Sequence, residues 1–200
     1  KKLGLPINKL IVATNQNDIL HRAISKGKYE AEHVSETISP SMDIQIASNF
    51  ERLIYDLNNH DSSQTLDDMK NIKQNGKYTI DDEKLKKINQ DFLSARMSEQ
   101  ETLDVIKNIY EKFNMVLDPH TAIGYGAFDK HDLKGNNIVL ATAHPCKFPD
   151  AILKAINLKS DLPDELKFIL DEEENYGIIE NSFKEIKQYI LGKIKWKLKR

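Results

Sequence analysis

Cysteine and tryptophan are scarce in this sequence, which has one of each among its 200 residues. The single cysteine, Cys146, excludes a disulfide bond within the chain and suits a reducing compartment. No apolar run approaches the length of a membrane span, and the opening KKLGLPINKL lacks the apolar core and cleavage site of a signal peptide. From these absences we expect a cytoplasmic protein with no membrane partner.

A charge excess of one sign is also missing. The formal net charge is -2, and charged residues of both signs, 30% of the total, are interspersed along the chain. The sequence therefore has no basic field of the kind that neutralises nucleic-acid phosphates, and we expect no nucleic-acid partner. The 200 residues, 40% of them hydrophobic, are enough for one large domain or two small ones with a core.

Several sequence motifs that are typical of nucleotide-binding, hydrolytic or metal sites are absent as well. We find no P-loop, GxGxxG, GxSxG, HExxH or CxxC pattern. Asp118 with His120, and His144 with Cys146, offer atoms that zinc binds, but one residue separates the members of each pair, which is poor ligand spacing. We predict no metal site, and a metal-dependent hydrolase built from Asp118, His120 and His144 remains an alternative. A nucleophilic Cys146 would need a base that the sequence does not identify.

The sequence does contain an alternation of strands and helices. Apolar, β-branched runs predict strands at residues 9–14 and 136–144, and a helical pattern follows each of them. Asn17 or Asp18 caps the helix after the first strand, and Pro149 stands near the first position of the helix after the second. This order predicts an α/β fold, with part of a mostly parallel open sheet and flanking helices.

Residues 61–114 differ in composition, since charged residues alternate there with apolar ones at helical intervals. We predict three helices, at Gln64–Gln74, Asp81–Ala95 and Ser98–Phe113. Ser98 and Glu101 form a capping box at the start of the third. We interpret this segment as a helical insertion with solvated charged faces.

The domain boundaries follow from this pattern. We expect residues 1–158 to form the α/β domain that contains the insertion. Residues 159–200 are expected to form a helical extension, with one short helix and one long C-terminal helix. The opening residues resemble the end of a helix, so we expect the chain to be a piece of a longer protein.

Open α/β sheets bind ligands beyond the carboxyl ends of their strands, and two such ends are visible. Thr14 and Asn15 end the first predicted strand, and Thr142 and His144 end the second. A threonine hydroxyl can donate and accept a hydrogen bond, so it can contact a ring nitrogen or a phosphate. The alternative is a hydroxyl that bonds only to its own strand end.

A second polar group lies between residues 39 and 52, where Asp43, Asn49 and Arg52 precede or begin a predicted helix. An arginine near a helix N-terminus suits a carboxylate or a phosphate. The alternative is an ordinary capped helix with an exposed arginine.

Four segments together resemble the C-terminal part of the threonine synthase family. They are GLPINKLIVATNQNDIL (4–20), SPSMDIQIASNFERLIYDL (39–57), DPHTAIG (118–124) and LATAHPCKFPDAI (140–152). The resemblance runs in order from Gly4 to about Ile156, and its blocks are long. It implies a pyridoxal-phosphate (PLP) enzyme of the tryptophan-synthase-β type, fold type II, which converts O-phosphohomoserine and water to threonine and phosphate.

The resemblance also implies what this chain lacks. The family's Schiff-base lysine and glycine-rich phosphate loop are expected upstream of Lys1, so we expect no catalytic residue in this chain. The chain would be the C-terminal portion of the enzyme, inactive alone, and its partner would be the missing N-terminal half of the same enzyme.

The resemblance assigns one cofactor contact, because Thr142 falls on the family threonine that hydrogen-bonds the pyridine nitrogen of PLP. A neutral hydroxyl, unlike an aspartate, does not force that nitrogen to carry a proton. The substrate candidates are Asn15, Ser41, Asp43, Asn49, Arg52, Asp118, His120 and His144. Asp118 has the alternative of capping its helix, and His120 that of packing. The rival function is a non-catalytic α/β ligand-binding or regulatory module that uses the same strand-end threonines.

Overall fold

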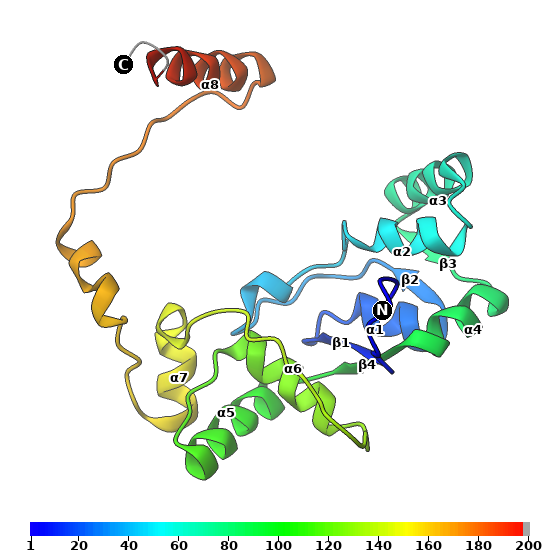
Figure 1. The fold of residues 1–200 in the computed structure, drawn as a ribbon, viewed down its shortest axis with the longest axis horizontal. Helices are drawn as coiled ribbons and strands as arrows, with labels where there is room; N and C mark the ends of the chain where they lie inside the picture. Colours follow the sequence, from blue (N-terminus) through cyan, green and yellow to red (C-terminus); the bar gives the residue numbers. More distant parts are fainter. Residues whose placement is uncertain (198–200) are drawn as a thin grey trace. The chain divides into compact units, whose positions relative to one another are not determined.

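The computed structural model describes residues 1–197. They divide into two compact units, residues 1–161 and the residues from 162 onward (Figure 1).

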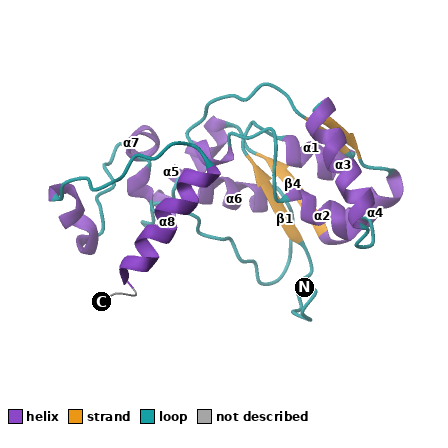
Figure 2. Cartoon of the chain, turned by 90° about the horizontal axis from the view of Figure 1, so that it is seen from above, coloured by secondary structure: helices purple, strands orange, loops and turns teal. Residues whose placement is uncertain are grey.

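A pair of parallel strands in the first unit joins distant parts of the chain. β1 (Leu10–Thr14) pairs with β4 (Phe92–Arg96), so that Thr14 lies opposite Arg96. Two helices, α1 (Ile19–Lys26) and α6 (Pro119–Asp129), pack against this pair and lie on opposite sides of it in Figure 2. Because the strands are parallel, their carboxyl ends meet at one edge, where ligands bind in open α/β sheets.

The other elements of the first unit are mainly helical. The helices are α2 (Phe50–Leu57), α3 (Ser62–Asn75), α4 (Asp82–Asp91), α5 (Glu99–Phe113) and α7 (Pro149–Ile156), with 3-10 turns η1 (Pro40–Met42) and η2 (Pro145–Lys147). β2 (Lys28–Glu30) and β3 (Lys77–Thr79) form a short antiparallel ribbon.

Two glycines connect this ribbon to the helices before it. Gly27 ends α1 and Gly76 ends α3, with φ angles of 68° and 66° that favour glycine. The carbonyl of Gly27 accepts the N–H of Ile80 at 2.8 Å, and the carbonyl of Gly76 accepts the N–H of Ala31 at 2.8 Å. Each glycine therefore ends a helix and extends one side of the ribbon.

Two apolar cores stabilise the first unit. The larger joins α1, α2, α3, α4 and the ribbon, and its most deeply buried side chains include Ile19, Tyr29, Ile54 and Ile88. The smaller joins α5, α6 and α7 through Ile106, Ala122 and Ile152. The smaller core fixes α6, whose start carries two of the predicted site residues, Asp118 and His120.

The α/β prediction is confirmed, and so are the capped starts of α5 and α6, whereas Asp18 precedes α1 without a side-chain capping bond. α5 follows Ser98, whose N–H donates to the Glu101 carboxylate at 2.7 Å while its hydroxyl accepts the Glu101 N–H at 3.3 Å. α6 begins at Pro119, directly after Asp118. These starts depend on contacts within a few residues, which a local pattern can encode.

Two predicted elements are wrong. The helix predicted to reach Ala95 ends at Asp91, and the next five residues form β4. Residues 61–114 therefore contribute a strand to the central pair and are not purely helical. Residues 136–144 are not a strand: Ile138 is 87% exposed, Leu140 is 76% exposed, and no strand within residues 1–197 pairs with them. Apolar, β-branched residues form a strand only where a neighbour accepts and donates their backbone hydrogen bonds.

The second unit contains a 3-10 segment, η3 (Asp164–Asp171), and the long helix α8 (Phe183–Lys197).

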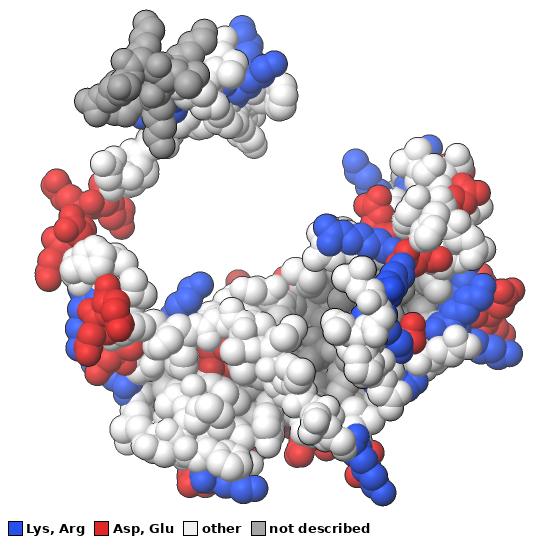
Figure 3. Space-filling view, in the orientation of Figure 1, with Lys and Arg blue, Asp and Glu red and all other residues white. Residues whose placement is uncertain are grey.

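No helix in the described part of the chain is long and apolar enough to cross a membrane. On the face drawn in Figure 3, lysines and arginines lie among aspartates and glutamates around α3 and α4, without a field of one sign.

Candidate functional site

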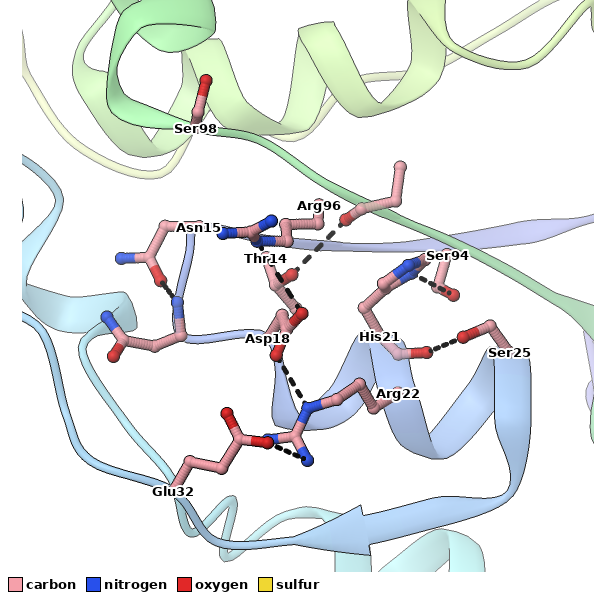
Figure 4. A network of polar contacts seen from close by, with 12 residues as sticks. Thr14, Asn15, Asp18, His21, Arg22, Ser25, Glu32, Ser94, Arg96 and Ser98 are labelled. Atoms are coloured by element: carbon pink, nitrogen blue, oxygen red, sulfur yellow. Dashed lines mark hydrogen bonds and ion pairs between the residues drawn. The ribbon is translucent and has the colours of Figure 1, made fainter.

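At the carboxyl end of β1, the first predicted strand-end threonine bonds within the sheet. The Thr14 hydroxyl is buried and donates to the carbonyl oxygen of Ala95 in β4, at 3.5 Å (Figure 4). Its hydroxyl is therefore directed at the neighbouring strand β4, and not only at its own strand end as the alternative reading had it.

Asn15 and Asp43, two of the substrate candidates, contact each other. The Asn15 side-chain nitrogen lies 2.6 Å from Asp43 Oδ1 and within 3.0 Å of the hydroxyls of Thr37 and Ser39. Asp43 also accepts the Asn17 side-chain amide at 2.9 Å and the Thr37 N–H at 2.8 Å. These bonds hold the loop before η1 against the end of β1. They also engage the side-chain amide of Asn15 and the carboxylate of Asp43, the groups through which these two residues would contact a substrate.

Charged side chains, Asp18 and Arg22 among them, lie next to the hydrogen bonds between Asn15 and Asp43. Asp18 accepts from Arg22 at 2.8 Å and lies 3.7 Å from Arg96 of β4, while Arg22 also pairs with Glu32 at 3.0 Å (Figure 4). The nearby His21 lies 3.0 Å from Ser94, and burial is the largest of the effects that lower its pKa. The spacing of Asp18 and Arg22 on one helix face was a local signal for this pair.

A cavity of about 490 Å³ opens beside the carboxyl end of β4. It is lined by His21, Ser94, Ala95, Arg96, Ser98, Glu101, Lys130 and His131. Lys130 pairs with Glu101 at 2.7 Å, and Arg96 lies near Asp18, so acidic partners offset its two permanent cations. The sequence did not predict this cavity, because its lining comes from four elements that only the fold brings together.

The first turn of α6 contains a second polar group, formed by Asp118, His120 and Thr121. Asp118 is 1% exposed and accepts the backbone N–H of His120 at 2.9 Å and that of Thr121 at 3.4 Å. It also accepts the Thr121 hydroxyl and contacts His120 Nδ1 at 3.0 Å. Asp118 thus caps the helix, as the sequence allowed, and also orients two side chains.

The ring of His120 is held from both sides. The Ser41 N–H donates to His120 Nε2 at 3.3 Å, so Nε2 is the acceptor and Nδ1 carries the proton that Asp118 accepts. The ring also packs against Phe148, with centroids 4.8 Å apart. His120 is therefore a packed side chain that joins η1 to α6.

Thr142 reaches the same group from the extended segment before η2. Its N–H donates to Thr121 Oγ1 at 3.1 Å, and its hydroxyl oxygen lies 3.3 Å from the same atom. Thr142 is exposed as a residue, although its hydroxyl contact with Thr121 is partly buried. We call Asp118, His120, Thr121 and Thr142 the Thr142 cluster.

The remaining candidates lie elsewhere. Asn49 and Arg52 line an apolar groove of about 340 Å³ with residues of β1, β4, α1 and α2. His144 is exposed, and its Nδ1 accepts the Cys146 N–H at 3.2 Å, which caps η2. Among the described residues, no three His, Cys, Asp or Glu side chains are grouped so that they could hold a metal ion.

Comparisons with known proteins agree with the resemblance seen in the sequence. The family model "Threonine synthase, C-terminal" matches residues 121–190, which include Thr121 and Thr142. Threonine synthase of Pseudomonas aeruginosa is 36% identical over 95% of this chain, and that of Saccharomyces cerevisiae is 42% identical over 84% of it. The crystal structure of PLP-bound threonine synthase from Brucella melitensis covers 94% of the chain at 40% identity, with a TM-score of 0.84.

The chain belongs to the threonine synthase family. It spans 41% of the Pseudomonas protein, 38% of the yeast protein and 41% of the Brucella chain. The family membership predicted from four segments is therefore confirmed, and the fold-type prediction with it. The individual roles of Thr142 and of the eight substrate candidates remain predictions.

Proposed function

We propose that this chain is the C-terminal part of a PLP-dependent threonine synthase, which converts O-phosphohomoserine and water to threonine and phosphate. In this proposal residues 1–158 belong to the catalytic α/β domain and residues 159–200 form an extension. The enzyme acts in the cytoplasm, and the portion of its relatives that this chain does not span supplies the lysine that binds the cofactor.

One observation carries the proposal: Thr142 is an exposed threonine whose backbone N–H is bonded to the buried, hydrogen-bonded side chains of the cluster. The Thr142 N–H is bonded to Thr121, and Thr121 is bonded to a carboxylate that is 1% exposed. A hydroxyl held in this way fits the ring nitrogen of PLP, which needs one hydrogen-bond partner of either polarity. When bound, PLP supplies an electron sink for elimination and addition at the substrate side chain.

The exposed segment before Thr142 supports a partner from the same enzyme. Ile138 and Leu140 are more than three-quarters exposed, although their residue types favour a buried strand. We propose that a strand in the part of the enzyme outside this chain pairs with residues 136–141. Such pairing would place Thr142 at a strand end, where ligands bind in open α/β sheets.

For substrate contacts, the geometry favours candidates whose polar groups are not already occupied. Ser41 is exposed and lies beside the Thr142 cluster through its N–H bond to His120. His144 is exposed two residues after Thr142 and keeps Nε2 for a ligand. Asn15, Asp43, Asp118 and His120 are proposed to hold the site in shape, while Asn49 and Arg52 line a different groove.

The test is Thr142→Val in the full-length enzyme, with Thr79→Val as the matched control, since Thr79 is an exposed threonine of the ribbon. PLP binding is followed by absorbance, and phosphate release is measured with O-phosphohomoserine. We expect Thr142→Val to weaken PLP binding about fivefold, as the loss of one ordinary hydrogen bond does, and Thr79→Val to bind normally.

The outcomes separate the two functions. A wild-type enzyme that binds no PLP would refute the proposal. A protein that binds PLP but releases no phosphate from O-phosphohomoserine would favour the non-catalytic binding module. Equal PLP affinity in wild type and Thr142→Val would show that this threonine does not contact the cofactor.

A further inference from the structure

The cavity beside the carboxyl end of β4, which we call the β4 cavity, lies at the opposite end of α6 from the Thr142 cluster. Lys130 and His131 follow the end of this helix, which has 11 residues and is therefore about 16 Å long. The other lining residues come from α1, β4 and the start of α5. Four segments thus converge on a volume of about 490 Å³ that the proposed PLP contact does not use.

The lining of the β4 cavity favours an anion. It contains two permanent cations, Arg96 and Lys130, and one carboxylate, that of Glu101. Glu101 is already engaged, since it pairs with Lys130 at 2.7 Å and accepts the Ser98 N–H at 2.7 Å. The charge of Lys130 is therefore offset within the lining, whereas that of Arg96 is not.

Arg96 is the cation that remains available to a ligand. Asp18 lies 3.7 Å from Arg96 but only 2.8 Å from Arg22, so one carboxylate is shared between two guanidinium groups. At 3.7 Å the contact is an ion pair and not a hydrogen bond, which leaves the N–H groups of Arg96 for another acceptor. A guanidinium with free N–H groups can bind two oxygens of a carboxylate or a phosphate at once.

Two histidines of the lining add groups that an anion can engage. His131 Nε2 is buried and has no hydrogen-bond partner among the residues that the structure describes, which is unusual for a buried polar atom. His21 faces Ser94 of β4, with its Nδ1 3.0 Å from the serine hydroxyl, which leaves its Nε2 for another contact (Figure 4). A ligand with several oxygens would give both rings a partner.

The charges around His21 show the same preference. Burial is the largest of the effects that lower its pKa; Asp18 opposes this, while Lys26, Arg96 and Lys130 add to it. An anion beside His21 would offset those cations and raise the pKa, so binding would be coupled to proton uptake. The titratable and charged side chains that act on His21 or share the cavity with it come from α1, β4, α5 and the end of α6: Asp18, Lys26, Arg96, Glu101, Lys130 and His131.

We propose that the β4 cavity is a binding site for a phosphate group, which Arg96 binds through its guanidinium while His21 and His131 donate to the remaining oxygens. A phosphate fits better than a carboxylate because these donors come from three segments of the chain. The two oxygens of a carboxylate would be occupied by the Arg96 guanidinium alone. The inference goes beyond the proposed function and does not depend on PLP.

The experiment uses the full-length protein, loaded with PLP and labelled with ¹³C in its histidines. The NMR signals of His21 and His131 are assigned with His21→Gln and His131→Gln. When inorganic phosphate is added, we expect both signals to move to a saturating value and the pKa of His21 to rise. Glycerol phosphate, added in the same way, distinguishes a site that accepts phosphomonoesters from one that accepts only the free ion.

The decisive variant is Arg96→Gln, with Lys154→Gln as the matched control. Each removes one positive charge near the start of α5, but Lys154 pairs with Glu99 at 2.8 Å and does not line the cavity. Arg96→Gln should weaken phosphate binding at least about tenfold, as the loss of a charged hydrogen bond does, and Lys154→Gln should leave it unchanged. If Arg96→Gln does not fold, His131→Gln tests the same site through the His21 signal, with an expected loss of about fivefold.

The outcomes are distinct. Unmoved His21 and His131 signals in the wild type would overturn the inference and would mean that water alone satisfies His131 Nε2. Equal phosphate affinities of wild type and Arg96→Gln, or an equal loss in Lys154→Gln, would overturn it too. So would phosphate that changes only the PLP absorbance, because it would bind at the cofactor. A wild-type protein that binds no PLP would instead refute the proposed function, and the phosphate titration would still decide the β4 cavity.

Discussion

Gly27→Ala should destabilise the protein far more than Gly76→Ala, although the two glycines have nearly the same backbone conformation. A Cβ atom at either φ angle, 68° or 66°, costs about 1 kcal/mol because L side chains are strained there. At Gly27 the new Cβ would also lie 2.8 Å from the carbonyl oxygen of Ile80. That oxygen belongs to the backbone of the ribbon and cannot rotate away as a side chain can.

The extra cost at Gly27 comes from moving this backbone. The Ile80 N–H donates to the Gly27 carbonyl at 2.8 Å, and Ile80 is 3% exposed, so a shift would disturb both a hydrogen bond and the core. Overpacking of this kind costs about 1–3 kcal/mol more. At Gly76 the new Cβ would meet only Ala31, at an ordinary 3.9 Å.

We would measure the free energy of unfolding of the full-length protein and both variants by urea denaturation, followed by circular dichroism. We expect losses of about 1 kcal/mol for Gly76→Ala and about 2–4 kcal/mol for Gly27→Ala, with unchanged m-values. Equal losses would refute the argument, because they would mean that the Ile80 carbonyl does not limit the space at Gly27.

Two further predictions concern helix starts. Asp118→Ala should lower the free energy of unfolding by about 3 kcal/mol, because it leaves buried donors without a partner. Asp61→Ala, at the exposed start of α3, should lower it by only about 1 kcal/mol. Similar losses for the two variants in urea denaturation would show that burial of the cap is unimportant. Hydrogen bonding to Lys130, and then to Ser98, lowers the pKa of Glu101 from 4.5 to about 2. Its stabilising contribution is therefore complete above about pH 4.5 and is lost as the pH falls toward 2, so Glu101→Gln should flatten the dependence of stability on pH in that window and leave its slope elsewhere unchanged.

The parts of the fold that the sequence predicted are those specified by neighbouring residues. The start of α5 depends on Ser98 and Glu101, and the start of α6 on Asp118 and Pro119. β4 was read as the end of a helix, because Phe92 continues the apolar spacing of α4. What makes it a strand is β1, which lies far away in sequence, so no local pattern could indicate the pairing.

The candidate site divides in the same way. Asp118 and Thr142 were predicted, while Thr121 was missed although a signal was available. A helix whose cap is followed three residues later by a polar side chain often returns a hydrogen bond to the cap, and Thr121 stands at that position after Asp118. The contact between Thr121 and Thr142 joins two separate segments, and only the fold could reveal it.

The pairing of β1 with β4 also has a consequence for the order of events during synthesis. β1 precedes β4 in the chain, and β4 is made only after the ribbon and the helices α1 to α4 have been translated. Until then Ile11 and Val12 belong to an edge that other chains could pair with. Because this loop is long, we expect the pairing of β4 with β1 to be a late and slow step of folding. The edge formed by the carboxyl ends of the two strands can therefore exist only after β4 has been translated.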